Sequence, residues 1–323
     1  MNNIIIIGAG PSGYTAGVYL ARAGLKPLIL AGEKAGGQLM LTTEVENYPG
    51  FSKGIMGPKL MEEMREQAKK FGAEIENKDV TKVDLEGEIK KVWVGDKEYQ
   101  TKAVIVSTGA KARMLKVGEE KLLGKGVSTC AVCDAAFFKD KITYVVGGGD
   151  AAMEEVMALK RQAKKVSLIY RGDKLRASKA MQEKVLGDKQ VEVIWNSEVV
   201  GVVGEQKLEK IKVKNSKTEE EKELLAGGLF LAIGHLPVTE VFKDKLLIDK
   251  KGYLKTYMTG KTEGVDQQKI WMEGFPTQTS VKGVFGAGDV VDFRYRQAIT
   301  AAGMGCMAAL DAEKYITESV SGY

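Results

Sequence analysis

Residues 4–13 read IIIIGAGPSG, and this stretch decides the fold. Four consecutive isoleucines predict a strand that is buried on both faces, as in a parallel sheet. The glycines that follow, Gly8, Gly10 and Gly13, have the spacing G-x-G-x-x-G, and residues 14–24 continue with helical spacing. In this strand–turn–helix context the glycines permit a tight turn and let a pyrophosphate approach the helix N-terminus. The stretch therefore predicts the start of a dinucleotide-binding domain.

A second predicted strand, over residues 27–30, ends shortly before an acidic residue, Glu33. Dinucleotide-binding domains usually carry an acid about 20 residues beyond the glycine motif, where it binds the ribose. Glu33 fits this spacing loosely, and we expect it to be the ribose ligand.

A second glycine cluster, GGGDAA at residues 147–152, has the related spacing G-x-G-x-x-A. It follows a predicted strand over residues 142–146 and opens a predicted helix. The next strand, over 166–169, leads into Tyr170 and Arg171, where a site for NAD would carry an acid. Because an arginine is what a 2′-phosphate needs, NADP is favoured over NAD. Two such folds predict two dinucleotides, and a flavin and a nicotinamide are the natural pair for electron transfer.

Length and composition exclude several classes of protein. The 323 residues suit two or three domains, and 44% hydrophobic with 28% charged residues excludes wholesale disorder. The longest apolar runs have only strand length, and residues 1–13 show no pattern of a secretory signal, so we expect neither a membrane span nor a secretory signal. The net charge of +5 is spread along the chain, which gives no sign of a nucleic-acid surface. We therefore expect a cytoplasmic protein with neither a membrane nor a nucleic acid as its partner.

The histidine and cysteine content narrows the chemistry. The sequence has a single histidine, His235, which excludes metal sites built from several histidines. It also excludes Ser-His-Asp and Cys-His catalysis, unless His235 is itself the catalytic base. Cys130 and Cys133 form C-x-x-C, and Cys306 stands apart, which does not suit a secreted disulfide framework. The pair indicates redox chemistry, or half of a zinc site whose other half is missing, so we expect no metal. Asp134 is the local candidate for the acid that protonates a thiolate, with a turn or helix-cap role as the alternative.

The chain resembles low-molecular-weight thioredoxin reductase, the homodimeric flavoprotein type of bacteria, fungi and plants, over nearly its whole length. The motifs that carry this resemblance are residues 8–13, 36–39 (GGQL), 42–51 (TTEVENYPGF), 130–134 (CAVCD), 147–150, 232–235 (AIGH), 286–289 (GAGD) and 295–303 (YRQAITAAG). The resemblance implies an α/β fold with two Rossmann-like, three-layer ββα dinucleotide-binding domains. The FAD-binding domain would be discontinuous, at residues 1–115 and 246–323. The NAD(P)H-binding domain with the redox-active C-x-x-C would span 116–245.

The resemblance also implies the activity, which is that of a thioredoxin-disulfide reductase. NADPH would reduce FAD, the reduced flavin would open the disulfide of Cys130 and Cys133, and the dithiol would reduce thioredoxin. Cys133 would be the cysteine near the flavin, and Cys130 the one that exchanges with thioredoxin. A homodimer is expected, and hinges between the domains would lie near residues 116–117 and 243–245.

The cofactor sites follow when the family's binding residues are carried over to matching positions of this sequence. FAD would be bound by Gly8, Gly10, Pro11, Ser12, Glu33, Gln38, Asn47, Val80, Asp289, Arg296, Gln297 and Ala298. NADPH would be bound by Gly149, Asp150, Ala151, Arg171 and Arg176.

The main departure from the family pattern lies at the NADPH site. The family usually has His-Arg-Arg-Asp where this chain has residues 170–173, YRGD, so Gly172 removes one of three cations. A charge-assisted contact contributes on the order of 1.5–3 kcal/mol, so the preference for NADPH should be weaker. A related disulfide reductase that uses NADH, ferredoxin or a deazaflavin is the alternative enzyme. A flavin-binding redox sensor is the alternative that is not an enzyme.

Three smaller departures lie elsewhere. Ala135 replaces a glycine after the active-site aspartate, and it would strain the turn if that position needs a positive φ. Ser107 replaces an alanine beside the first hinge. Residues 257–274 are longer than the family's connection, and we interpret them as a surface hairpin, with a docking loop or dimer contact as the alternative.

Overall fold

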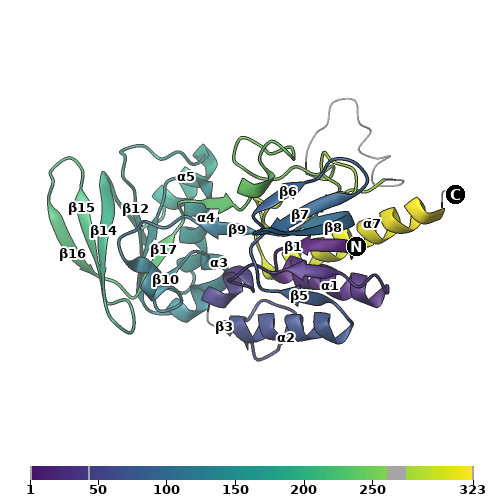
Figure 1. Cartoon of the computed structure of the whole chain (residues 1–323). Coiled ribbons are helices and arrows are strands. Elements are labelled where there is room, and N and C mark those ends of the chain that lie inside the picture. The colour runs from purple at the N-terminus through teal and green to yellow at the C-terminus, as the bar shows by residue number, and fades with distance from the viewer. Residues whose placement is uncertain (1, 43, 260–273, 322–323) are drawn as a thin grey trace. The chain divides into compact units, whose positions relative to one another are not determined.

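The structure is a computed structural model that describes residues 2–42, 44–259 and 274–321. The chain forms two compact units, Met1–Lys111 with Leu236–Tyr323, and Ala112–His235. Each unit is built on a largely parallel sheet with helices, which confirms the predicted α/β fold (Figure 1). Of the longer connection at residues 257–274, residues 260–273 lie outside the part that is described.

Both crossings between the units come earlier in the chain than the resemblance implies. Residues 115–117 belong to the second unit, because the buried carboxylate of Glu119 accepts hydrogen bonds from their three backbone N–H groups. Phe242 and Leu246 belong to the first unit, because their buried side chains are part of its core. Of the residues expected to act as hinges, 116–117 therefore lie in the second unit and 243–245 in the first.

The first unit has a sheet in the order β5-β2-β1-β8-β7-β6, with β19 beside the end of β8. The strands are β1 (Asn2–Ile7), β2 (Leu28–Leu30), β5 (Glu74–Glu76), β6 (Lys82–Asp84), β7 (Lys90–Val94), β8 (Lys97–Val106) and β19 (Val284–Gly286). The helices are α1 (Pro11–Arg22), α2 (Gly57–Lys70) and the long α7 (Ala298–Ser321). β5, β2, β1, β8 and β19 are parallel, whereas β6 and β7 are antiparallel. Figure 1 shows α1 and α2 on the opposite side of β1 from β6 and β7.

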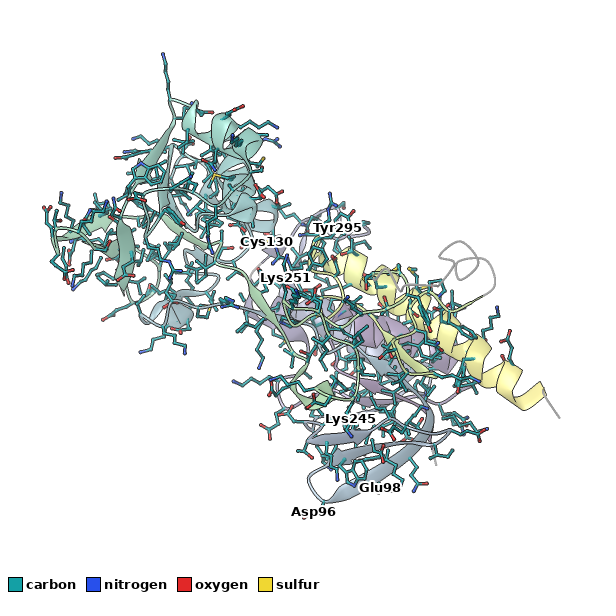
Figure 2. The ribbon with its side chains drawn as sticks, turned by 90° about the horizontal axis from the view of Figure 1, so that it is seen from above. Asp96, Glu98, Cys130, Lys245, Lys251 and Tyr295 are labelled. Atoms are coloured by element: carbon teal, nitrogen blue, oxygen red, sulfur yellow. A yellow bond between two sulfur atoms is a disulfide. The ribbon has the colours of Figure 1, made fainter. Side chains whose placement is uncertain are left out.

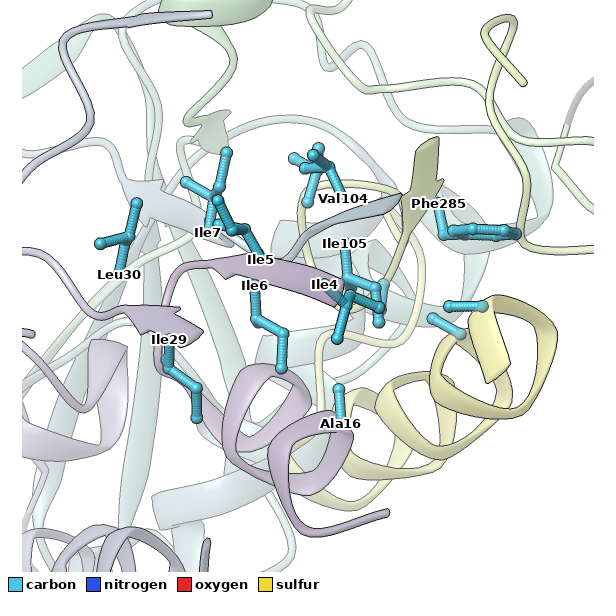
Figure 3. Close-up of a cluster of buried hydrophobic side chains, with 14 of the residues drawn as sticks. Ile4, Ile5, Ile6, Ile7, Ala16, Ile29, Leu30, Val104, Ile105 and Phe285 are labelled. Carbon is cyan, nitrogen blue, oxygen red and sulfur yellow. The ribbon is translucent and has the colours of Figure 1, made fainter. Parts of the chain in front are cut away.

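The isoleucine strand lies at the centre of this unit's core, as its composition predicts. Ile4, Ile5 and Ile6 have no exposed surface. Their side chains alternate, so Ile4 and Ile6 point to the face where Ala16 of α1 lies, while Ile5 points to the other face (Figure 3). Both faces are covered, which explains why an unbroken β-branched run is stable here.

Close packing between α1 and α7 depends on a glycine of α7. A Cβ atom on Gly305 would lie 2.1 Å from the backbone oxygen of Ser12, closer than any real contact. A Cβ atom on Gly303, in the same helix, would have nothing within 4 Å. Substituting alanine at these two positions therefore distinguishes the effect of helix propensity on stability from the effect of helix–helix packing.

We expect Gly305→Ala to lower the free energy of unfolding by about 1–3 kcal/mol or more, because backbone atoms of α1 have to move. Gly303→Ala should leave it unchanged or raise it by about 0.5–1 kcal/mol, because alanine favours the helix over glycine. Urea denaturation of the purified variants measures both values. Equal effects of the two substitutions would contradict this account of the packing.

The second unit has a parallel sheet in the order β10-β17-β11-β12-β13 and an antiparallel sheet β14-β15-β16. The parallel strands are β10 (Val127–Ser128), β11 (Ile142–Val146), β12 (Lys165–Ile169), β13 (Val191–Ile194) and β17 (Gly228–Leu231). The antiparallel strands are β14 (Ser197–Val203), β15 (Lys210–Asn215) and β16 (Glu221–Leu225), and the helices are α3 (Ala131–Asp134), α4 (Asp150–Leu159) and α5 (Lys179–Leu186). Alternate residues of β11 join different cores, Val145 that of α4 and Tyr144 that of β15. The central sheet is thus buried on both faces.

The remaining elements are short. They are the strand pairs β3 (Glu44–Val45) with β4 (Ile55–Met56) and β9 (Ala110–Ala112) with β18 (His235–Pro237), and the 3-10 turns η1 (Gly37–Leu41), η2 (Glu119–Leu122), η3 (Ala135–Phe138) and η4 (Glu240–Phe242). Within the described residues, every helix is too short or too polar to cross a membrane.

Candidate active site

In the glycine turn after β1, two of the three glycines have no room for a side chain, and the third faces open space. Gly8 has φ +106°, and a Cβ atom there would lie 2.4 Å from the backbone oxygen of Ser107. A Cβ atom on Gly13 would lie 2.1 Å from the backbone oxygen of Gly8. By contrast, Gly10 precedes α1 and has nothing within 4 Å of its Cβ direction. The turn therefore leaves room for a phosphate beside the first N–H groups of α1.

The residues expected to bind FAD on the two sides of this turn lie on surface loops. Gln38 is exposed in η1, and the N–H of Gly36 just before it donates to the backbone oxygen of Ala9 at 3.1 Å. This bond holds the Gln38 segment against the glycine turn.

Glu33 is exposed beyond the end of β2. Its backbone N–H donates to the carboxylate of Asp79 at 3.1 Å, and Val80 follows, half-buried against the core. This bond uses the backbone of Glu33 and not its exposed carboxylate.

The segment after β19 lies on the first turn of α1. A Cβ atom on Gly288 would lie 2.6 Å from the hydroxyl oxygen of the buried Ser12. Asp289 comes next, and burial raises its pKa to about 7, helped by the nearby Asp292 carboxylate and opposed by Arg296. A carboxyl group that titrates near neutral pH can either donate or accept a hydrogen bond from a ligand hydroxyl.

The loop before α7 is held in place by the Asp292 carboxylate, and it contacts a residue that is distant in sequence, Asn47. The carboxylate of Asp292 accepts from the N–H groups of residues 294–296, and Arg296 has a positive φ of 50°. Tyr295 in this loop is 62% exposed (Figure 2). The Asn47 side-chain amide donates to the side-chain oxygen of Gln297 at 3.3 Å, so two of the residues expected at the flavin meet directly beside Ala298.

Cys130, just before the short helix α3, and Cys133, within it, form a disulfide in the second unit. Cys130, labelled in Figure 2, caps α3, and the N–H of Cys133 donates to its sulfur at 3.2 Å. Such a donor stabilises a thiolate on Cys130 once the disulfide is open. Both cysteines are half-buried, and Val132 between them is 65% exposed. The turn that carries the disulfide therefore lies at the surface of the second unit.

Asp134 ends α3, and a residue that the sequence reasoning missed holds its carboxylate. The hydroxyl of Ser128 lies 2.6 Å from Asp134 Oδ2, and the N–H of Cys130 donates to the same hydroxyl at 3.0 Å. Burial raises the pKa of Asp134, and the bond from Ser128 lowers it. Ala135 has φ −54°, so alanine in place of the usual glycine causes no strain. In the described part of the chain, no group of three or more His, Cys, Asp or Glu side chains could hold a metal.

The second glycine turn, after β11, is shaped by a tyrosine. A Cβ atom on Gly148 would lie 2.1 Å from the Tyr170 ring, and one on Gly172 would lie 3.0 Å from the ring's other edge. A side chain at position 172 would therefore be in tight contact with the Tyr170 ring, which would have to shift by a few tenths of an ångström. Gly149, at the start of α4, has open space in its Cβ direction, as Gly10 has in the first turn.

The loop that carries Arg176 is fastened to this turn by its backbone. The N–H groups of Arg176 and Ala177 donate to the backbone oxygen of Gly148 at 2.7 and 3.0 Å. Asp150, beside the exposed Ala151, accepts from the N–H and the hydroxyl of Ser178 at 2.8 and 2.9 Å. These four bonds place the Arg176 segment at the N-terminus of α4.

The two arginines expected to bind the 2′-phosphate are accessible at the surface. Arg171 and Arg176 are both exposed, so their guanidinium groups can meet a phosphate from solvent. The Asp150 side chain is used to hold Ser178, so its place in the site is to fix the loop.

Comparison with known proteins agrees over almost the whole chain. A family model described as pyridine nucleotide-disulphide oxidoreductase matches residues 2–305. The thioredoxin reductase of Streptomyces coelicolor is 53% identical over 319 residues, which cover 98% of this chain and 94% of that protein. Thioredoxin reductase 1 of Saccharomyces cerevisiae is 44% identical, and 98% of each chain is covered.

Two solved structures give the same result. A thioredoxin reductase from Streptococcus pyogenes superposes with a TM-score of 0.87 at 37% identity, covering 98% of this chain and 100% of that one. One from Giardia duodenalis has a TM-score of 0.85 at 41% identity, with 98% of each chain covered.

Proposed function

The chain belongs to the pyridine nucleotide-disulphide oxidoreductase family, and we infer from this premise that it is a thioredoxin-disulfide reductase. It uses a flavin and a pyridine nucleotide, and it passes electrons through the Cys130–Cys133 disulfide to thioredoxin. The observation that carries this conclusion is a disulfide in an accessible helical turn, in a chain that also has two open glycine turns. Reduction of oxidised thioredoxin by the purified protein with a nicotinamide donor tests it.

We propose FAD as the flavin and the first unit as its binding domain. The fit is supported by the turn that is closed at Gly8 and Gly13 but open at Gly10, beside the buried Ser12. The pyrophosphate would be held by Gly8, Gly10, Pro11 and Ser12, the ribose by Glu33 with Val80 nearby, and the rest of the molecule by Gln38, Asn47, Asp289, Arg296, Gln297 and Ala298. When bound, FAD supplies two-electron exchange between a nicotinamide and a disulfide.

We propose that the second unit binds NADPH. Gly149, Asp150 and Ala151 would form the turn at the pyrophosphate, and Arg171 with Arg176 would bind the 2′-phosphate. The exposure of both guanidinium groups and the backbone bonds that fasten Arg176 support this choice. NADH would then be a weaker donor.

Arg176→Ala is expected to raise the KM for NADPH by roughly tenfold or more, because a charge-assisted contact to the 2′-phosphate is lost. The KM for NADH should change little, since NADH has no such phosphate. Arg161→Ala is the control, because Arg161 is also exposed but follows the far end of α4. Steady-state kinetics with each donor measure the effect. A similar rise for NADH would contradict the assignment.

We propose that the reaction at the sulfurs follows ordinary thiol–disulfide exchange. The thiolate of Cys130 attacks one sulfur of the thioredoxin disulfide, and that disulfide breaks as a mixed disulfide forms. The thiolate of Cys133 then attacks the Cys130 sulfur, which re-forms the Cys130–Cys133 disulfide and releases the second thioredoxin sulfur. Two electrons pass to thioredoxin, and Asp134 can hold or release a proton beside the pair.

We also propose that the protein works as a cytoplasmic homodimer. This rests on the resemblance to the low-molecular-weight thioredoxin reductases, and light scattering on the purified holoenzyme tests the dimer.

A further inference from the structure

The Ser128 hydroxyl lies within hydrogen-bonding distance of three groups inside the disulfide turn, which are the N–H and the backbone oxygen of Cys130 and the carboxylate of Asp134. It is the last residue of β10, and only 5% of it is exposed. Its oxygen lies 3.0 Å from the N of Cys130 and 2.6 Å from Asp134 Oδ2. The Cys130 N–H can only donate, so Ser128 accepts there. The single hydroxyl proton goes to the Asp134 carboxylate at 2.6 Å and not to the Cys130 backbone oxygen at 3.4 Å, because the carboxylate is closer and charged. One hydroxyl thereby joins the backbone of the first cysteine to the carboxyl group of Asp134.

The surroundings leave Asp134 dependent on this hydroxyl. Burial raises the pKa of Asp134, and the Ser128 hydroxyl is the cause that lowers it. η3 packs against α3 and has no titratable side chain, whereas α4 supplies Asp150, Glu154 and Glu155. None of these three is among the causes that shift Asp134. The other titratable groups of the turn are the two cysteines themselves, once they are reduced.

We propose that Ser128 is a positioning residue for thiol–disulfide exchange, which ties the Asp134 carboxyl group to the backbone of Cys130 and sets the pH range in which that group exchanges a proton. The proposal rests on the proposed function for its role in turnover. Ser128 itself neither forms nor breaks a bond. In the exchange, the proton moves between the Asp134 carboxyl group and a cysteine sulfur.

Removing the Ser128 hydroxyl should shift the pKa of Asp134 in a predictable direction. Without the donor, the ionised form of Asp134 loses its stabilising bond, so the protonated form persists to higher pH. The part of the pH profile that depends on Asp134 should therefore move upward in Ser128→Ala, by about one pH unit. Ser128→Thr keeps a hydroxyl and should restore the wild-type profile. In Asp134→Asn, the Ser128→Ala change should add no further shift.

The test uses the holoenzyme and two readouts over a range of pH. One is kcat/KM for thioredoxin, and the other is the rate at which iodoacetamide alkylates the reduced enzyme, which needs no thioredoxin. Ser197→Ala is the matched control, because Ser197 is equally buried in the same unit but donates to the backbone oxygen of Trp195. It should lose similar stability with no shift of either profile.

The possible results distinguish a failure of the Ser128 proposal from a failure of the proposed function. A shift in Ser128→Ala that Thr restores and Asp134→Asn abolishes supports the proposal. Unchanged profiles in Ser128→Ala, or an equal shift on the Asp134→Asn background, overturn it. If the wild type does not reduce thioredoxin, the proposed function fails while the alkylation profiles still decide the role of Ser128. Ser128→Gly, which also lacks the hydroxyl, replaces the alanine variant if that variant does not fold.

Discussion

Cys133→Ser is expected to abolish the reduction of thioredoxin, lowering kcat by more than about a thousandfold, while the protein still folds and keeps its flavin. The reason is that serine cannot form the Cys130–Cys133 disulfide through which the electrons pass. Cys306→Ser is the control, because Cys306 lies in α7 outside the disulfide and should leave turnover nearly unchanged. NADPH-dependent thioredoxin reduction measures both. Substantial turnover in Cys133→Ser would remove the disulfide from the reaction path.

The two single-cysteine variants also distinguish the roles of the sulfurs. If Cys130 attacks thioredoxin, Cys133→Ser leaves the attacking thiolate without its resolving partner, and a mixed disulfide with thioredoxin should accumulate. Cys130→Ser should form much less of it. Non-reducing electrophoresis with oxidised thioredoxin shows which variant traps the partner. Trapping by Cys130→Ser instead would exchange the two assignments.

Gly8→Ala is expected to have the largest effect on folding and flavin retention, with a loss of stability of about 3 kcal/mol or more. Its φ of +106° disfavours any side chain, and its Cβ atom would lie 2.4 Å from the backbone oxygen of Ser107. Because this turn joins β1 to α1, the shift would distort the site proposed for the pyrophosphate.

A control separates the close approach from the backbone conformation. Gly72 has nearly the same φ, +103°, and nothing within 4 Å of its Cβ direction. Gly72→Ala should therefore show only the conformational cost, of about 1 kcal/mol, and retain its flavin. Gly10→Ala should fold normally but bind flavin more weakly, because the space it fills is proposed for phosphate. Thermal unfolding and bound-flavin absorbance report both properties. Equal losses in Gly8→Ala and Gly72→Ala would contradict the account.

The strands and glycine turns could be predicted because their signals are local. Ile4, Ile5 and Ile6 form an unbroken β-branched run because both faces of β1 are buried, and Gly8 follows where the chain turns tightly into α1. By comparison, the meeting of Asn47 and Gln297 joins residues far apart in the chain. Spacing could not reveal it, and only the family resemblance brought both residues to the site.

Two residues of the second unit escaped prediction because their roles exist only after folding. Ser128 is one of many serines in the sequence, and it matters because α3 brings the Asp134 carboxylate back to the end of β10. Glu119 likewise gives no motif, yet its buried carboxylate fixes residues 115–117 and moves the unit boundary. The loss of an arginine at Gly172 was visible in the sequence. The close approach of the Tyr170 ring to this position could not be seen there.

An anaerobic titration of the purified holoenzyme with NADPH, followed by addition of oxidised thioredoxin, tests the central claim most directly. The account predicts that the protein takes up one electron pair for the flavin and a second for the Cys130–Cys133 disulfide. Thioredoxin should then reoxidise it, with the appearance of thioredoxin thiols. Uptake of a single pair, or a fully reduced protein that thioredoxin does not reoxidise, would contradict the claim that this disulfide carries electrons to thioredoxin.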